Sequence, residues 1–265
     1  MPDHTIFNER PESQDRALKV IERLGYTIVP RSEAERKRGS RKAVLFTEEL
    51  QAFLSKQTYR FGSETRYFSG GAIARAMQAV DQNSAAGLYA ANKEIYELIC
   101  SGKSMEEELP DGTRQSFDIR YIDFEHPENN TFQVTDEFEV ERPNGRFARP
   151  DLVVLVNGIP LVVIECKKSS VDVMEGVTQN IRNWGEDYIP HLFRYAQLVM
   201  AMNPDKVLYG TCGTPAKYFV SWHEDNKDWL NDWCRKCSPD GQIREQDRAL
   251  VSLLHPERQV GGQAV

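Results

Sequence analysis

The chain has 265 residues, of which 40% are hydrophobic and 28% charged, a composition ordinary for a globular protein with a sizeable core. Its net charge of −7 argues against a surface that binds nucleic acid over its whole area. No apolar run approaches the roughly 18 residues that span a bilayer, and the first residues lack the pattern of a secretory signal. We therefore expect a cytoplasmic protein without membrane contact.

The first expected element is an amphipathic helix near the start of the chain. Ser13 stands before it as a candidate N-cap, and Gly25 follows it as a stop signal. The apolar positions that recur at helical spacing are Ala17, Leu18, Ile21 and Leu24.

A basic cluster follows in a polar stretch that contains Gly39 and Ser40, which is typical of an exposed loop. Most loops of this kind are simply solvated, but clustered positive charge also suits contact with DNA phosphates. Both interpretations stay open at this point. The residues of the cluster are Arg31, Arg36, Lys37, Arg38, Arg41 and Lys42.

The middle of the chain alternates between helical and strand patterns. Residues 72–100 are rich in good helix formers and predict one or two helices. Alternating apolar residues over 117–140 predict antiparallel strands. Helical patterns return over residues 173–184 and 189–202, before a strand-like run at 206–210.

Two apolar, β-branched runs, residues 151–156 and 159–167, stand on either side of Asn157-Gly158, a dipeptide typical of tight hairpins. Their continuous apolar character predicts strands that are buried on both faces. The second run nevertheless ends in Glu165 and Lys167, whose side chains share one face because they stand two positions apart. Burying a lone charge is costly, so these residues need a partner or a function.

The register of this hairpin decides whether Asp151 lies beside Glu165. A regular two-residue loop at Asn157-Gly158 places Asp151 opposite Ile164, with its carboxylate on the wrong face. A third loop residue, or a bulge, pairs Asp151 with Glu165 and brings both carboxylates to one side. We therefore expect a three-residue loop or a bulge.

Asp151, Glu165 and Lys167 form a combination suited to phosphodiester hydrolysis. Two carboxylates within reach of one hard cation, with water completing its shell, are what Mg²⁺ requires. An adjacent ammonium group can orient a water molecule and stabilise negative charge on a phosphate. The alternative from a different class is a non-catalytic DNA-binding or assembly module in which these charges form a structural ion network.

A zinc site is a further candidate in the C-terminal part. Cys234 and Cys237 have the spacing of half a zinc site, and Cys212 and His223 could complete four ligands. A second closely spaced pair is missing from the sequence. We therefore favour reduced thiols, which also fits the odd number of cysteines, five.

The segment from Arg149 to Lys167 closely resembles the nuclease motif of the restriction (R) subunit of type I restriction-modification enzymes. Further similarities follow in that family's order and extend over roughly residues 12–225; they lie at residues 92–102, 122–124, 130–132, 189–197 and 210–214 and at Trp222. The resemblance implies the PD-(D/E)xK fold, an α/β restriction-endonuclease-like core whose mixed central sheet is flanked by helices. It also implies a Mg²⁺-dependent endonuclease for double-stranded DNA, with Asp151 and Glu165 as metal ligands and Lys167 as catalytic lysine.

The resemblance also suggests supporting residues and partners. Gln179 matches the first half of a Gln-x-x-x-Tyr pair found in related nucleases and is a fourth catalytic candidate, although Asn183 replaces the tyrosine. Cys166 stands where leucine is common, so only its backbone carbonyl would ligate the metal. Lys168 is a further candidate for DNA contact. The implied partners are modification and specificity subunits; another PD-(D/E)xK repair or defence nuclease is the alternative within the same class.

The resembling R subunits carry an ATP-driven motor after the nuclease. Residues 101–104 read Ser-Gly-Lys-Ser but lack the upstream glycine of a phosphate-binding loop, so ATP is expected to act only through motor domains outside this chain. We expect three parts: residues 1–110, mainly helical and packed on the core; residues 111–225, the nuclease core; and residues 226–265, a polar connector towards the motor.

Overall fold

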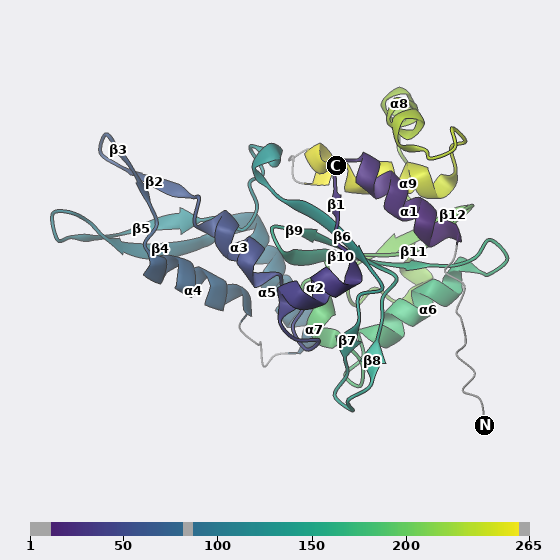
Figure 1. Ribbon diagram of the computed structural model, residues 1–265, viewed down its shortest axis with the longest axis horizontal. Helices are drawn as coiled ribbons and strands as arrows, with labels where there is room; N and C mark the ends of the chain where they lie inside the picture. Colours follow the sequence, from purple (N-terminus) through teal and green to yellow (C-terminus); the bar gives the residue numbers. More distant parts are fainter. Residues whose placement is uncertain (1–11, 82–86, 260–265) are drawn as a thin grey trace.

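The computed structural model describes residues 12–81 and 87–259; the outer ends of the first and last expected parts, residues 1–11 and 260–265, lie outside the described residues. The described chain is a mixed α/β structure in which helices cover both faces of a six-stranded sheet (Figure 1). Its α-helices are α1 (Glu12–Arg23), α2 (Arg31–Arg38), α3 (Thr47–Leu54), α4 (Gly70–Asp81), α5 (Leu88–Ser101), α6 (Val173–Asn183), α7 (Pro190–Phe193), α8 (Lys227–Cys237), α9 (Glu245–Leu254) and α10 (Pro256–Gln259). Two short 3₁₀ turns are η1 (Pro127–Asn129) and η2 (Ala216–Tyr218).

The large sheet has the strand order β1-β6-β9-β10-β11-β12 and is mixed in direction. Strand β10 runs parallel to β11 because α6 lies in the connection between them, as a parallel pair requires. The β6–β9, β9–β10 and β11–β12 pairs are antiparallel. Its strands are β1 (Thr27–Ile28), β6 (Phe132–Asp136), β9 (Leu152–Val156), β10 (Ile159–Cys166), β11 (Leu198–Asn203) and β12 (Lys206–Gly210).

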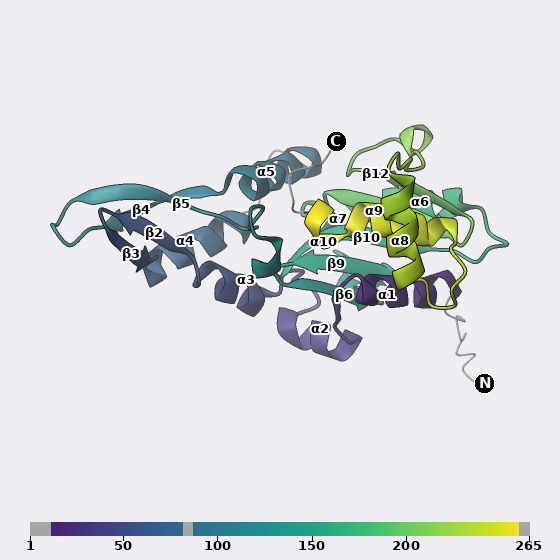
Figure 2. The same ribbon diagram turned by 90° about the horizontal axis from the view of Figure 1, so that it is seen from above.

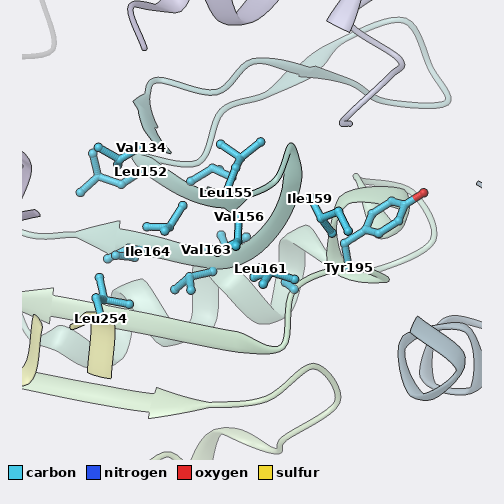
Figure 3. Close-up of a cluster of buried hydrophobic side chains, with 14 of the residues drawn as sticks. Val134, Leu152, Leu155, Val156, Ile159, Leu161, Val163, Ile164, Tyr195 and Leu254 are labelled. Carbon is cyan, nitrogen blue, oxygen red and sulfur yellow. The ribbon is translucent and has the colours of Figure 1, made fainter. Parts of the chain in front are cut away.

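The centre of the sheet is the core of the protein. Every residue of β9 and β10 is buried, which confirms the expectation drawn from their unbroken apolar runs. Helices α1 and α9 cover one face of the sheet, and α6 covers the other (Figures 1 and 2). The side chains drawn in this packed cluster (Figure 3) include Val134, Leu152, Leu155, Val163, Ile164 and Leu254.

The β9–β10 hairpin contains the irregularity expected from the sequence. Asn157 and Gly158 form a two-residue turn with φ of 50° and 80°, the left-handed values of a type I′ turn. The register then shifts between Pro160 and Val162, so that Leu161 is an extra residue. Because Leu152 pairs with Ile164 beyond the bulge, Asp151 falls opposite Glu165.

Gly158 is sterically required in this turn. A Cβ atom at Gly158 would lie 2.3 Å from the carbonyl oxygen of Phe46, in addition to the strain of a positive φ. Gly112 has the same φ of 80° and open space around it. We expect Gly158→Ala to lower the free energy of unfolding by about 3 kcal/mol and Gly112→Ala by only about 1 kcal/mol. Urea unfolding of both variants measures this difference; equal losses would mean that the contact with Phe46 relaxes freely.

An arm of smaller elements projects from the core at one end of the molecule (Figures 1 and 2). Its hairpins pair β2 with β3 and β4 with β5, and α4 packs against β4. The strand pattern predicted from Phe117 is confirmed in β5, whose partner is β4. Outside the large sheet the strands are β2 (Thr58–Phe61), β3 (Glu64–Tyr67), β4 (Lys103–Glu108), β5 (Arg114–Ile119), β7 (Val140–Glu141) and β8 (Phe147–Ala148).

Two expectations about local structure are corrected. The helix predicted over residues 189–202 stops at Phe193, and residues 198–202 form β11 instead. A short apolar run suits a buried strand and a buried helix equally, and pairing with β10 and β12 decides between them. Ser13 is no N-cap: it lies inside α1 and its hydroxyl donates to the carbonyl of Lys167.

The segment expected as a polar connector is folded up to residue 259, where the described chain ends. Helices α8 and α9 pack on α1, and Leu250 and Leu254 are fully buried. Arg16 in α1 forms a buried ion pair with Asp247, at 2.7 Å between Nη2 and Oδ2. These contacts attach the segment to the core; the path towards a motor stays a prediction. In the described ranges no helix is long and apolar enough to cross a membrane.

Candidate active site

The charged end of the central hairpin lies beneath α6. Asp151 precedes β9, Glu165 lies near the end of β10, and Lys167 follows that strand directly. Asp151 stands opposite Glu165, the charges of the two carboxyls influence each other, and the backbone N–H of Cys166 donates to Oδ2 of Asp151 at 2.7 Å. The bulge therefore brings both carboxyls to one place, as the sequence predicted.

Gln179 of α6 connects Glu165 and Lys167. Its amide nitrogen donates to Oε2 of Glu165 at 2.6 Å, and its amide oxygen accepts from the ammonium group of Lys167 at 2.6 Å. The orientation of Gln179 is thus fixed at both ends, because only this arrangement matches one acceptor and one donor. The sequence predicted that Gln179 belongs to this group of residues, and the geometry brings it there.

Asn183 is a site residue that the sequence reasoning missed. It stands one helical turn after Gln179 and donates through Nδ2 to Oε1 of Glu165 at 3.3 Å. Each carboxyl oxygen of Glu165 thereby accepts from an amide of α6. The signal was present in the sequence, since residues four apart share one helix face, but Asn183 appeared only as a departure from a Gln-x-x-x-Tyr pattern.

Gly176 allows α6 to approach the strand ends closely. A Cβ atom there would lie 3.0 Å from Cβ of Ala201, 3.5 Å from Cβ of Glu165 and 3.6 Å from Cε of Lys167. Gly176, Gln179 and Asn183 share one helix face. A glycine on this face lets the two amides reach the carboxyl of Glu165 directly.

Helix α1 fixes the backbone of the site from the other side of the sheet. Ser13 donates to the carbonyl of Lys167 at 2.7 Å, and Gln14 donates to the carbonyl of Asp151 at 3.2 Å. Both side chains are fully buried. Glu137 adds a backbone N–H bond of 2.9 Å to the same Asp151 carbonyl. None of these three residues was a sequence candidate for the site. The contacts of Ser13 and Gln14 join segments more than a hundred residues apart, and that of Glu137 is made by its backbone.

The environment of the two carboxyls favours their protonated forms. Burial raises the pKa of Glu165 well above its ordinary value, and the adjacent Asp151 raises it further. Burial likewise raises the pKa of Asp151, although the N–H of Cys166 and the charge of Lys167 oppose this. Each carboxyl, when ionised, disfavours ionisation of its neighbour. Burial also raises the pKa of the Cys166 thiol, which makes it a poor nucleophile at neutral pH.

The donor set of this group suits a hard divalent cation. Two adjacent carboxyls, both with raised pKa values, would lose their mutual repulsion when a cation binds between them. The described residues contain no group of three or more His, Cys, Asp and Glu side chains placed to hold a metal ion. A site for Mg²⁺ would therefore rest on these two carboxylates, the carbonyl of Cys166 and water, a set compatible with its coordination.

The pocket beside the site opens along α6. It has a volume of about 500 Å³, and Lys167, Gln179 and Arg182 are among the residues that line it. Lys168, an expected DNA contact, is exposed in the turn that follows β10. The side chain of Lys167 is thus accessible from this pocket.

The basic cluster predicted as an exposed loop is folded. Residues 31–38 form helix α2, which packs on α3 and β6, and Arg38 is buried with its guanidinium 4.0 Å from the ring centroid of Phe138. Burial lowers the pKa of Arg38 to about 10. The loop assignment is wrong for residues 31–38, because local polarity does not reveal a distant partner such as Phe138, and it is confirmed for Arg41 and Lys42, which lie in an exposed turn.

The other basic residues of the cluster have acidic partners. Arg31 and Arg41 both bind Glu139, at 2.7 and 2.8 Å. The remaining pairs are Arg36 with Glu33, Lys37 with Glu33 and Glu49, and Lys42 with Glu141. None of these basic residues lines the pocket of Lys167. DNA contact by this cluster stays a prediction, and its charges are largely balanced within the protein.

The cysteines considered as zinc ligands are free thiols in the described part of the chain. Cys212, Cys234 and Cys237 are buried, and His223 is exposed with Nε2 at 3.6 Å from Asp225. Burial raises the pKa of Cys234 to about 12 and that of Cys212 to about 11. The four residues do not gather into a metal site.

The fold and the site together define a mixed α/β protein with a buried carboxyl pair, a lysine and an amide bridge at one end of its central sheet. The model of the family described as the type I restriction enzyme R protein N terminus matches residues 6–218. The chain belongs to this family. The resemblance seen over roughly residues 12–225 is confirmed.

Three relatives illustrate the match. The type I restriction enzyme HindI endonuclease subunit of Haemophilus influenzae is 25% identical over 225 residues, which are 82% of this chain and 20% of that protein. A Methanocaldococcus jannaschii protein, provisionally named the type I restriction enzyme MjaIXP endonuclease subunit, is 33% identical over 138 residues, 51% of this chain and 13% of that protein. The type I restriction enzyme SsaAORF53P endonuclease subunit of Staphylococcus saprophyticus is 36% identical over 85 residues, 32% of this chain and 9% of that protein. The chain thus spans a fifth or less of the length of these relatives.

Proposed function

We propose that this chain is the nuclease domain of a type I restriction enzyme R subunit and hydrolyses phosphodiester bonds of double-stranded DNA with Mg²⁺. The proposal rests on one observation: the bulged hairpin places Asp151 beside Glu165, and Gln179 hydrogen-bonds both Glu165 and Lys167. Membership of the R-protein family and the names of the relatives, all endonuclease subunits, support it. The arrangement matches the PD-(D/E)xK pattern, with Asp151, Glu165 and Lys167 as its three charged residues.

Each residue has a separate task in the proposed reaction. Asp151, Glu165 and the carbonyl of Cys166 would hold Mg²⁺, which when bound polarises a phosphate and makes water more acidic. Lys167, held by Gln179 at 2.6 Å, donates to a phosphate oxygen and stabilises charge that develops there. Asn183 and Gln179 keep the carboxyl of Glu165 oriented through its two oxygens. The substrate is double-stranded DNA, and the partners are the modification and specificity subunits together with the motor domains.

Calorimetric titration with Mg²⁺ tests the metal site. We expect the wild-type chain to bind Mg²⁺ and Asp151→Asn to weaken binding more than about tenfold, because the variant removes one of two anionic ligands. Asp172→Asn is the matched control, since Asp172 lines the same pocket but is exposed and caps α6. In a purely structural ion network, the wild-type chain would show no binding heat, and the nuclease assignment would fall.

A further inference from the structure

Two arginine side chains meet on one tyrosine ring at the edge of the candidate active site. The guanidinium carbon of Arg142 lies 3.8 Å from the centroid of the Tyr188 ring, and that of Arg182 lies 5.3 Å from it. Arg182 belongs to the last turn of α6, and Arg142 begins the loop between β7 and β8. The β7–β8 hairpin projects beside α6 (Figure 1).

The stack is close to the residues of the proposed chemistry. Arg182 lines the same pocket as Lys167 and Gln179. Its positive charge is also near enough to Glu165 to oppose the raised pKa that burial causes there. A phosphodiester chain that reaches Lys167 therefore passes the guanidinium of Arg182.

Neither arginine is neutralised within the described residues. Arg142 donates through Nε to the backbone carbonyl of Asp187 at 3.1 Å, and neither Arg142 nor Arg182 forms an ion pair with a described carboxylate. The arginines of α2 and its following turn differ in this respect, since Arg31 and Arg41 share Glu139. Two positive charges on one ring repel each other, and an anion bound between their edges would relieve that repulsion.

The contacts with the Tyr188 ring leave N–H donors of the guanidinium groups available to an anion. A ring covers the face of a guanidinium, whereas the N–H donors lie in its plane and point outward from its edge. At 3.8 Å the guanidinium of Arg142 lies against the Tyr188 ring, which restricts this side chain, and Arg182 lies further out at 5.3 Å; both keep N–H donors for a phosphate. The fixed contact to Asp187 further restricts Arg142.

We propose that Arg142 and Arg182, held on Tyr188, form a binding site for a DNA backbone phosphate next to the scissile one. The site positions the strand over Glu165 and Lys167 without taking part in the chemistry. The choice of DNA as the source of the phosphate rests on the proposed function. Inorganic phosphate carries the same chemistry, and the experiment separates the two sources.

Binding of a short DNA duplex over a series of KCl concentrations, with Ca²⁺ in place of Mg²⁺, tests this site. Each of Arg142→Ala and Arg182→Ala is expected to weaken binding roughly tenfold and to reduce the slope of log K against log salt by about 0.9. Tyr188→Leu should weaken binding while keeping the slope, because it removes the stack but no charge. Arg235→Ala removes a similarly exposed arginine of α8, which is paired with Asp232, and should change neither quantity.

The outcomes separate this inference from the nuclease assignment. Mg²⁺ titration of Arg142→Ala should match the wild type, because Arg142 neither lines the pocket of Lys167 nor belongs to the proposed metal ligands. Thermal unfolding of Arg182→Ala should match the wild type, because that side chain is exposed. If both arginine variants keep the wild-type affinity and salt slope, the phosphate site does not exist, whatever Asp151→Asn does to metal binding. If inorganic phosphate stabilises the wild type more than both arginine variants while all three proteins bind the duplex equally, the site takes free phosphate, and the DNA assignment is overturned.

Discussion

Lys167→Ala in the assembled, ATP-fuelled restriction enzyme that contains this chain is expected to slow plasmid linearisation more than about a hundredfold, with ATP hydrolysis unchanged. The ammonium group of Lys167 is held 2.6 Å from the amide oxygen of Gln179, which aims it into the pocket. Losing one positioned charge beside a reacting phosphate costs on the order of 3 kcal/mol in the transition state. ATP turnover is untouched because the chain contains no complete phosphate-binding loop.

The variant should fold normally, since Lys167 follows the last residue of β10 and its truncation removes no fully buried volume. Lys93→Ala is a matched control, because Lys93 is 70% exposed on α5 and pairs loosely with Glu97. The paired measurement is plasmid linearisation and ATP turnover on the same preparation. Linearisation by Lys167→Ala at a rate near that of wild type would make Lys167 a structural residue and refute the proposed active site.

The residues 151–167 were predictable because the decisive information is local. Two buried strands around Asn157-Gly158 leave few registers, and only an irregular one places Asp151 opposite Glu165. That the side chains of Glu165 and Lys167 point to the same face follows from strand geometry alone. The helix after them, α6, has the spacing that brings Gln179 to the site.

The rest of the site depends on contacts that no local pattern contains. Ser13 and Gln14 look like ordinary polar residues at a helix start, yet they donate to the carbonyls of Lys167 and Asp151, more than a hundred residues away. Arg31, Arg41 and Lys42 suggested DNA contact because their partners Glu139 and Glu141 lie about a hundred positions further on. The C-terminal segment is mostly polar, so its sequence did not predict α9, whose apolar face packs on α1.

The Ser101–Ser104 segment has part of the sequence of a phosphate-binding loop but not its structure. A phosphate-binding loop joins a strand to a following helix, so that the helix N-terminus faces the phosphates. Here the order is reversed, since Ser101 ends α5 and Lys103 begins β4. The missing glycine and the reversed order of helix and strand both argue that this segment is not a phosphate-binding loop. The expectation that ATP acts outside this chain stays a prediction.

Glu165→Gln is expected to change how stability depends on pH in the metal-free chain. Burial and the neighbouring Asp151 raise the pKa of Glu165 above its ordinary value of 4.5, so the folded state keeps a proton that the unfolded state has released. The unfolded state then binds fewer protons, and the free energy of unfolding falls as pH rises from 4.5 towards the raised value. The slope is at most about 1.4 kcal/mol per pH unit for one proton.

The variant removes this titration, because the amide that replaces the carboxyl carries no proton to release. Urea unfolding in EDTA should therefore show nearly equal stabilities for variant and wild type at pH 5 and a more stable variant at pH 8. Mg²⁺ should stabilise the wild type at pH 8 and leave the variant almost unchanged, since binding to the folded state alone shifts the equilibrium. Glu175→Gln is the control, because Glu175 is an exposed acid of the same pocket. Parallel pH profiles for wild type and Glu165→Gln would show that Glu165 is ionised and compensated without a metal, as a structural ion network requires.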